Sequence, residues 1–143
     1  MAKKSNYGGY LIKVGDWKIP FKWMSANTYK PFNSGQDLDS TRDTDGMLHR
    51  TALKNTIIKT DFEIPPMKTD EDYAEFFGKL EQQYIDKVEK SCNVTAWIPE
   101  LNKYVTQKCY VPDITPTLYF ADDNVIKYNS TRIAFIGYGG KTR

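Results

Sequence analysis

The sequence predicts an α+β, mainly β fold: an antiparallel β-sandwich or partly closed barrel of about seven to eight strands with one packed helix. Short stretches rich in β-branched and aromatic residues recur between turn residues along the chain. One stretch, at about residues 69–90, instead repeats its apolar residues at helical spacing. With 143 residues, 40% of them hydrophobic and 14% aromatic, we expect residues 1–143 to form a single domain.

The first predicted element is a β-hairpin. Residues 10–14 (YLIKV) are rich in strand-forming side chains, Gly15-Asp16 is a turn pair, and residues 17–19 (WKI) resume the strand pattern. Residues 21–24 (FKWM), after a proline, predict a further short strand. The chain therefore opens with three short strands.

A polar stretch follows. Residues 34–46 (SGQDLDSTRDTDG) contain Leu38 as their only large apolar side chain, so they predict a long loop that is solvated or bound to a partner. Residues 48–64 then carry Thr, Ile and Phe and end at Pro65-Pro66, which cannot continue a central strand. They predict one long strand.

The helix has the clearest local signal. Thr69 is a suitable N-cap, and Asp70, Glu71 and Asp72 favour the first turn through the helix dipole. Apolar residues then recur three and four positions apart, which places them on one face. They are Tyr73, Phe76, Phe77, Leu80, Tyr84 and Val88. We expect this face, Phe77 included, to be buried against a sheet.

A second hairpin is predicted after the helix. Residues 93–98 and 104–111 are strand-like and flank the turn-like residues 99–102 (PELN). The register of a four-residue loop places Cys92 directly opposite Cys109. We expect both thiols to be reduced, because two cysteines are far fewer than a disulfide-held scaffold needs.

The remaining segments complete the expected organisation. Residues 117–120 predict a short strand, residues 121–124 a turn, and residues 126–138 a long closing strand. Residues 1–9 are expected to form an N-terminal arm and residues 137–143 a flexible C-terminal tail.

Charge and hydropathy limit the classes of partner. The 20 basic and 18 acidic residues give a net charge of +2, and the two signs are interspersed, which does not indicate a nucleic-acid or membrane partner. No apolar run approaches the roughly 18 residues of a membrane span, and no leader segment is recognisable. We therefore expect synthesis in a cytoplasm.

Candidate catalytic and metal-binding patterns are weak. His49 is the only histidine and has no Cys or carboxylate at ligand spacing. A calcium-loop alignment uses Thr41, Asp43 and Asp45 as ligands but puts Ala52 where a bidentate Glu is required. The sequence therefore predicts no enzyme, no catalytic residue, no cofactor and no metal site.

One alternative is a small β-barrel module that binds single-stranded nucleic acid or carbohydrate. Such a module needs exposed rings beside basic side chains on one sheet face. The candidate patch consists of Trp17, Lys18, Lys22, Trp23 and Tyr29. Aromatic residues in strands more often pack in the core, so this reading ranks second. An enzyme with unrecognised residues ranks third.

Three segments, taken in order, resemble a known family. They are residues 10–20 (YLIKVGDWKIP), residues 39–50 (DSTRDTDGMLHR) and residues 109–113 (CYVPD). They are similar to motifs of small tail proteins of phages of Gram-positive bacteria, the tail-tube and distal-tail proteins. The resemblance covers about residues 10–136. Pro112 stands where that family usually has glycine.

The resemblance implies a fold and a function. The expected fold is a β-sandwich with a flanking helix. The expected assembly is a ring of six copies in the tail of a virion, around a channel for DNA and the tape-measure protein. Synthesis in the host cytoplasm, no membrane, and contacts with neighbouring tube, tape-measure or baseplate proteins are further implications. The family brings no catalytic residues.

The polar loop is the expected contact between subunits. The resemblance contributes Arg42, Asp45, Gly46, Leu48 and Arg50. The loop itself adds Asp37, Asp39 and Asp43, because a carboxylate can accept hydrogen bonds from a neighbour's backbone or basic side chains.

Overall fold

The protein, seen in a computed structural model, consists of two antiparallel sheets and one α-helix. The structure describes residues 6–140, and at 36–40 and 51–54 it describes the backbone alone. In chain order the elements are β1 (Ile12–Val14), β2 (Trp17–Lys18), the 3-10 helix η1 (Phe21–Trp23), β3 (Lys30–Arg42), β4 (Leu48–Ile64), β5 (Lys68–Thr69), α1 (Asp70–Gln82), β6 (Ser91–Ile98), β7 (Lys103–Tyr110), β8 (Leu118–Ala121), β9 (Ile126–Tyr128) and β10 (Thr131–Gly137).

The sheets confirm the expected α+β, mainly β class. The larger sheet has seven strands in the order β2-β1-β6-β7-β10-β4-β3, and the smaller has three in the order β5-β9-β8. Because the larger sheet ends at β2 and β3, it is open and is not a closed barrel. No described helix is long and apolar enough to cross a membrane, and α1 has 13 residues.

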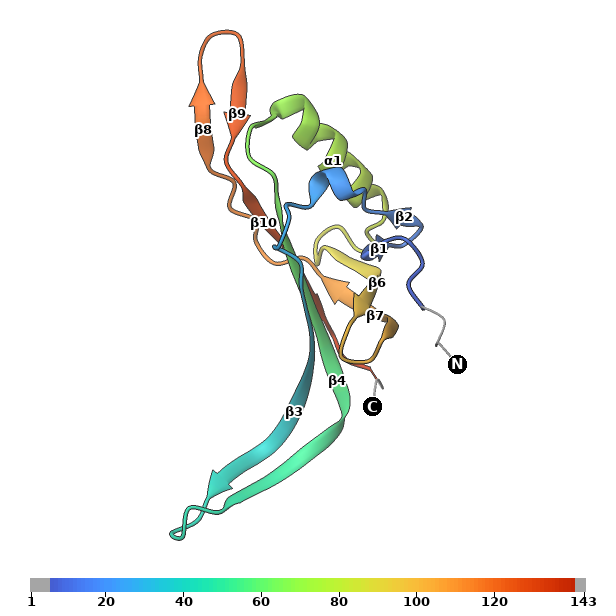
Figure 1. Ribbon diagram of the computed structural model, residues 1–143, viewed down its shortest axis with the longest axis vertical. Coiled ribbons are helices and arrows are strands. Elements are labelled where there is room, and N and C mark those ends of the chain that lie inside the picture. The colour runs from blue at the N-terminus through green and yellow to red at the C-terminus, as the bar shows by residue number, and fades with distance from the viewer. Residues whose placement is uncertain (1–5, 141–143) are drawn as a thin grey trace, which may run out of the picture.

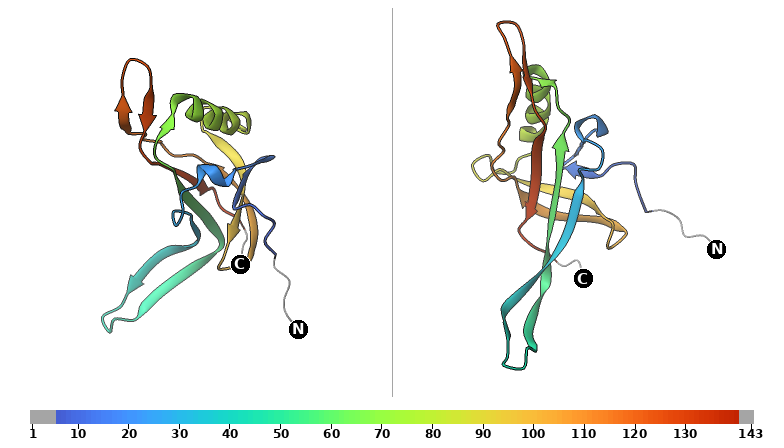
Figure 2. Two further views of the ribbon diagram at one scale, coloured as in Figure 1. Left: turned by 45° about the horizontal axis from the view of Figure 1, so that its top comes forward. Right: turned by 60° about the vertical axis from the view of Figure 1, so that its left-hand side comes forward.

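The molecule is elongated, with a hairpin at each end. Strands β3 and β4 extend beyond the body at one end, and β8 and β9 extend at the other (Figure 1). Both projections are visible in two further orientations (Figure 2). Helix α1 lies beside the body between them. The two hairpins therefore project from the body in opposite directions.

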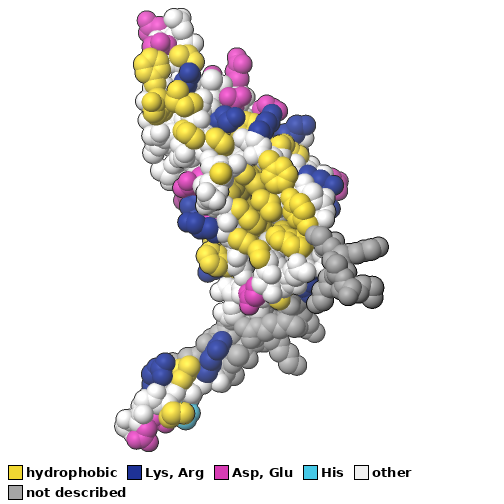
Figure 3. Space-filling view, viewed as in Figure 1, with side chains coloured by type: hydrophobic (Ala, Val, Ile, Leu, Met, Phe, Trp, Pro, Cys, Tyr) yellow, Lys and Arg dark blue, Asp and Glu magenta, His cyan; other side chains and the backbone are white. Residues whose placement is uncertain are grey.

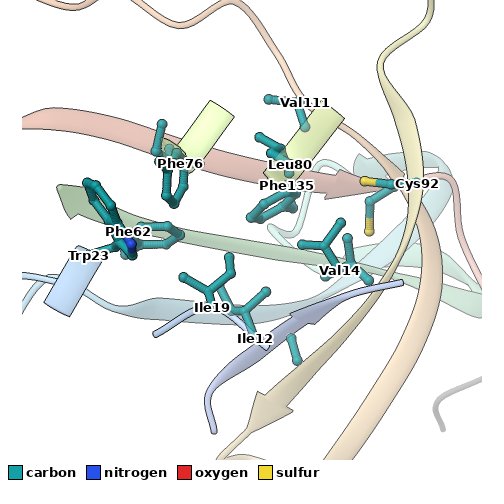
Figure 4. Close-up of a cluster of buried hydrophobic side chains, with 14 of the residues drawn as sticks. Ile12, Val14, Ile19, Trp23, Phe62, Phe76, Leu80, Cys92, Val111 and Phe135 are labelled. Atoms are coloured by element: carbon teal, nitrogen blue, oxygen red, sulfur yellow. The ribbon is translucent and has the colours of Figure 1, made fainter. Parts of the chain in front are cut away.

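The core lies between α1 and the inner face of the larger sheet. Phe76 of α1 is fully buried, and its ring centroid lies 5.4 Å from that of Trp17, 5.2 Å from Trp23 and 6.4 Å from Phe62. The close-up in Figure 4 shows Phe76 of the helix, Trp23 of η1 and Phe62 of β4 converging in this layer. This layer holds the body together and leaves the two hairpins outside it.

Helix α1 begins as predicted but ends earlier. The Asp72 amide donates to Thr69 Oγ1 at 3.3 Å, and the Thr69 amide donates to Asp72 Oδ2 at 3.1 Å, which completes a capping box. The predicted extension to residue 90 is wrong. Asp86 Oδ1 accepts the Val88 amide at 2.8 Å and the Glu89 amide at 3.3 Å, which turns the chain. Val88, expected on the apolar face, is 93% exposed.

Both predicted hairpins are confirmed. Lys13 pairs with Lys18 in the first. In the second, Ile98 pairs with Lys103 and Cys92 pairs with Cys109, as the four-residue loop predicts. Both thiols are buried and free.

Two strand predictions are wrong in detail. Residues 21–24 were expected as a strand, but Phe21–Trp23 form the 3-10 helix η1, which follows Pro20 and buries the Trp23 ring. The closing strand 126–138 is divided at residues 129–130 into β9, which joins the small sheet, and β10, which joins the large one. The Tyr73 hydroxyl lies 2.6 Å from Thr131 Oγ1 beside this break and holds it against the helix.

The expected loop at residues 34–46 is also wrong. Strand β3 continues to Arg42 and pairs with β4 from Lys30↔Asp61 to Arg42↔Leu48, with register shifts after Gly35 and Leu38. Backbone pairing with β4 therefore overrides the low strand propensity of Asp, Ser and Gly.

Both described chain ends are bonded to the body. At the C-terminal end, Gly137 closes β10 and Gly140 pairs with Thr56, so residues 137–140 are not a free tail. At the N-terminal end, Asn6 Nδ2 donates to the Asn102 carbonyl at 2.9 Å, and the Gly8 amide donates to the Tyr104 hydroxyl at 2.7 Å. The predictions for residues 1–5 and 141–143 lie outside the described residues.

Candidate functional site

The most prominent candidate surface is the part of the β3–β4 ribbon beyond the Gly35↔Thr56 pair. We call residues 36–55 the long hairpin. Its strands pair from Asp37↔Ala52 to Arg42↔Leu48, and all ten residues from 41 to 50 are exposed. It projects from the body in every view (Figures 1 and 2). The side chains of residues 41–50 are therefore exposed to solvent.

An internal hydrogen-bond network shapes the tip of the long hairpin. Asp43 Oδ1 accepts the amides of Asp45 and Met47, both at 3.0 Å. Its Oδ2 lies 2.9 Å from His49 Nε2. Gly46 has φ +83°, a conformation that favours glycine, and its carbonyl accepts from Arg42 Nη1 at 3.0 Å. The Asp43 carboxylate thus stabilises the turn at residues 43–47 by hydrogen bonds.

These contacts make the tip sensitive to acid. The His49 hydrogen bond, and then the turn amides, lower the pKa of the Asp43 carboxyl below its ordinary 3.8. A lowered carboxyl pKa stabilises the folded tip above the ordinary value, and this contribution is lost as pH falls through the lowered pKa. We expect an ordered tip above pH 3.8 and loosening below it, measured by NMR titration of the carboxyl and of the Met47 amide.

Substitution of His49 tests its effect on the pKa of Asp43. In His49→Val, a substitution that keeps strand propensity, the pKa of Asp43 should rise towards its ordinary value. Asp122 serves as the control, because the amides of Asn124 and Val125 lower its pKa without a histidine. An Asp43 titration that is identical in the variant would contradict this account of the tip.

The eight predicted interface residues all lie on the long hairpin. Arg42 and Leu48 face each other as a strand pair, Asp45 and Gly46 occupy the turn, and Arg50 is exposed in β4. Asp37 and Asp39 lie in β3 by their backbone, and their side chains are outside the described ones. Asp43 is engaged in its own turn and in the pair with His49.

Sequence reasoning missed one apolar residue at this tip. Met47 is 65% exposed and lies next to Leu48, which is 46% exposed. The signal was an adjacent apolar pair directly after the Asp45-Gly46 turn. The tip therefore combines an apolar contact surface with charged neighbours.

Neither the calcium pattern nor the histidine forms a metal centre in the described part of the chain. The Asp43 oxygens that the calcium pattern requires are occupied by amides and His49. Among the described residues, no three His, Cys, Asp or Glu side chains are grouped to hold a metal ion.

The aromatic and basic residues proposed as a stacking surface do not form one. Trp23 is 2% exposed, Trp17 packs edge-on to Phe76, and the Tyr29 hydroxyl donates to the Trp97 carbonyl at 2.7 Å. Burial raises the pKa of Tyr29. Lys22 Nζ lies 5.3 Å from the Trp23 ring centroid. Trp23 is buried and Trp17 and Tyr29 are partly buried against the core, so they do not form the exposed patch that this alternative requires.

A buried glutamine fixes the root of the long hairpin. Gln107 Oε1 accepts the Ile58 amide at 3.1 Å, and Gln107 Nε2 donates to the Thr56 carbonyl at 3.1 Å. Thr56 also exchanges two backbone hydrogen bonds with Gly140, of 2.9 and 3.0 Å. The side chain thus links β7 to β4 where the ribbon leaves the body.

Close packing around Gln107 requires a glycine in β10. A Cβ at Gly137 would collide with Gln107 Oε1 and lie 3.2 Å from the Ile58 carbonyl oxygen. The root of the long hairpin therefore depends on a glycine in β10 that leaves space for the Gln107 side chain of β7 beside β4.

Comparison with known proteins places the sequence in a family. Residues 1–138 match the model of a family described as being of unknown function, DUF6711. The chain belongs to this family. No curated protein matches the DUF6711 chain significantly. Among solved structures it is similar to a chain described as the tail of an empty GTA particle with C6 symmetry. The two are 14% identical, with 96% of the DUF6711 chain and 99% of the other covered, and a TM-score of 0.45. A similarity of this degree carries no conclusion about function.

Proposed function

We propose that the chain is a non-enzymatic structural protein of a phage tail that assembles with copies of itself into a ring. The long hairpin is the principal contact between copies. The observation that carries this proposal is a ribbon that leaves the body and exposes all of residues 41–50.

Energetics support a partner for the long hairpin. A two-stranded hairpin without a covering layer is at best marginally stable in water. Met47 and Leu48 also place apolar area in solvent at its tip. Burial against another subunit would remove this area from water and offset the cost of ordering the ribbon.

The tail assignment rests on the resemblance of three ordered segments to small phage tail proteins. In the structure, residues 10–20 include the β1–β2 hairpin, residues 39–50 surround the tip of the long hairpin, and residues 109–113 continue from the end of β7. In the ring, six copies would surround a channel for DNA and the tape-measure protein, in the tail tube, at its end or at the baseplate.

The absence of an enzymatic role is part of the same proposal. A concavity of about 400 Å³ is lined by Pro31, Phe32, Asn33, Ser34, Lys59 and Glu100. The histidine of this chain does not line this concavity; it lies at the exposed tip, paired with Asp43.

A shortened variant tests the function of the long hairpin. Residues 36–55 are replaced by Asn-Gly, which joins the paired residues Gly35 and Thr56 through a favoured two-residue turn. Both strands are removed together, because removal of one would leave the other without its partner. We expect the wild-type chain to form rings in negative-stain images and the variant to remain a monomer in size-exclusion chromatography with light scattering.

The variant also carries its own folding control. It retains the Thr56–Gly140 pair and the Gln107 hydrogen bonds, so its circular dichroism and thermal midpoint should stay close to those of the wild type. Rings formed by a folded variant would show that the long hairpin is not the contact.

A further inference from the structure

Three adjoining hollows lie on the body, beside the root of the long hairpin. The first is the concavity of about 400 Å³ between β3, β4 and the loop that holds Glu100. The second, of about 80 Å³, shares Phe32 and Lys59 with the first, and the third, of about 140 Å³, shares Asp61 and Arg132 with the second. Because neighbouring hollows share walls, they form one continuous surface, which we call the β3 groove.

The β3 groove contains one open aromatic ring. Phe32 is 55% exposed and lines both the first and the second hollow. Within the described residues it contacts no other aromatic ring, whereas Tyr10 and Tyr104 stack on each other with centroids 4.5 Å apart. An open ring is an apolar surface of fixed orientation. The C–H face of a sugar ring matches such a surface in size and polarity.

Charged side chains of both signs line the same groove in equal number. They are the basic Lys30, Lys59 and Arg132 and the acidic Asp61, Glu63 and Glu100. Arg132 donates to the Asp61 carboxylate from Nε at 3.0 Å and from Nη2 at 2.6 Å. Within the described residues the other four form no ion pair, and all four are exposed. Their donors and acceptors are therefore available to hydroxyl groups of a ligand.

The balance of charge disfavours a nucleic acid in this groove. Affinity for a polyanion depends on clustered Lys and Arg side chains, and here each basic side chain is matched by an acidic one. On the face of the molecule in Figure 3, basic and acidic side chains of the body are interspersed, and neither sign forms a continuous field. The β3 groove therefore favours a ligand without net charge.

The lining of the groove also disfavours a polypeptide. The cores of protein interfaces are depleted of Lys, Glu and Asp, which are the residue types that line the groove. A strand added to the edge of β3 would need backbone donors there, and Pro31 has no N–H. A neutral, hydroxyl-rich chain fits these features better than a peptide does.

We propose that the β3 groove binds a neutral oligosaccharide. The Phe32 ring stacks on one sugar unit, and Lys59 and Glu100 form hydrogen bonds with its hydroxyl groups. The adjoining hollows take the next units of a linear chain. A hollow of about 400 Å³ lies within the usual range of about 300 to 1,000 Å³ for small-molecule sites. The proposal goes beyond ring assembly and does not depend on it.

Ligand-observed saturation-transfer NMR with the full-length chain tests the proposal, because this method works for single copies and for large assemblies. The probes are neutral hexasaccharides of glucose, of galactose and of N-acetylglucosamine. We expect at least one of them to receive saturation from the protein and to bind with a Kd in the millimolar range or below. Absence of transfer to all three would overturn the proposal.

Two variants and a control locate the binding site. Phe32→Ala should raise the Kd about tenfold, because it removes the stacking surface. Phe21→Ala is the matched control, since Phe21 is 53% exposed on η1, outside the groove, and its loss should leave the Kd unchanged. Glu100→Gln lies on an exposed loop, keeps the shape of the side chain and should weaken binding several-fold, because it removes a charged acceptor. Circular dichroism checks that each variant is folded.

Three further outcomes would overturn the proposal. They are an equal Kd for folded Phe32→Ala and the wild type, displacement of the sugar by a thymidine oligonucleotide at physiological salt, and a cryo-electron microscopy map in which a neighbouring copy covers the β3 groove. The second would identify an anion site and the third a protein contact. Ring formation by the wild-type chain is read separately from negative-stain images, so failure of the sugar site and failure of ring assembly are distinguishable.

Discussion

Phe76→Ala is expected to lower the free energy of unfolding by about 3 to 5 kcal/mol, the usual range for truncating an enclosed phenylalanine. Phe76 has no exposed surface and contacts the rings of Trp17, Trp23 and Phe62. The substitution opens a cavity where η1, the helix and the sheet meet, and these rings cannot collapse into it without moving the backbone. Urea unfolding followed by circular dichroism measures the loss.

The neighbouring residue provides the control. Phe77 has the same side chain, one position along the helix, but it lies at the margin of the apolar face and is half-buried. The sequence pattern placed Phe77 among the buried residues, but the buried residues of α1 are Tyr73, Phe76 and Leu80. Phe77→Ala should therefore cost clearly less than Phe76→Ala. Equal losses would mean that the helix packs in a different rotation.

Gln107→Met is expected to lower the free energy of unfolding by about 2 to 4 kcal/mol, because it leaves buried backbone groups without a partner. Methionine keeps the length of the side chain, so the loss reports the hydrogen bonds to Ile58 and Thr56 and not a cavity. Hydrogen exchange should accelerate at the Ile58 amide, and the long hairpin should become more mobile relative to the body in NMR relaxation.

Gln82→Met is the matched control for this substitution, since Gln82 is exposed on α1. It should leave stability nearly unchanged. If Gln107→Met were equally neutral and the Ile58 amide stayed protected, the glutamine would not be the tie between β7 and the root.

Local chemistry explains which elements could be predicted. The loop at residues 99–102 sets the register of its hairpin, so the Cys92↔Cys109 pair followed from counting. Thr69 and the acids after it define the start of α1, because a capping box involves only residues three apart. Signals of this kind lie within a few residues of the structure that they determine.

The incorrect predictions depend on tertiary contacts. No Gly or Pro marks the end of α1. Asp86 accepts hydrogen bonds from two backbone amides after the helix, but in the sequence it looks like an exposed helical residue. The outer part of β3 looks like a loop because its polar residues form a strand only through pairing with β4. Tertiary pairing here overrides local propensity.

The sequence assigned the wrong structure to the candidate surface, and its role as a contact stays a prediction. The expected polar loop is part of a two-stranded ribbon. Asp43, expected to contact a neighbouring subunit, instead accepts hydrogen bonds from the amides of Asp45 and Met47 in its own turn. Met47 and the apolar residues of β8 were missed, because isolated apolar residues in a sequence read as core until burial is known.

We propose that copies of this chain meet through the long hairpin in a ring. Cryo-electron microscopy of the assembled full-length chain tests this contact. We expect a closed ring in which residues 36–55 of each copy lie against other copies. A ring whose subunits meet elsewhere, with the long hairpin free in solvent, would contradict it, as would a chain that stays monomeric at high concentration.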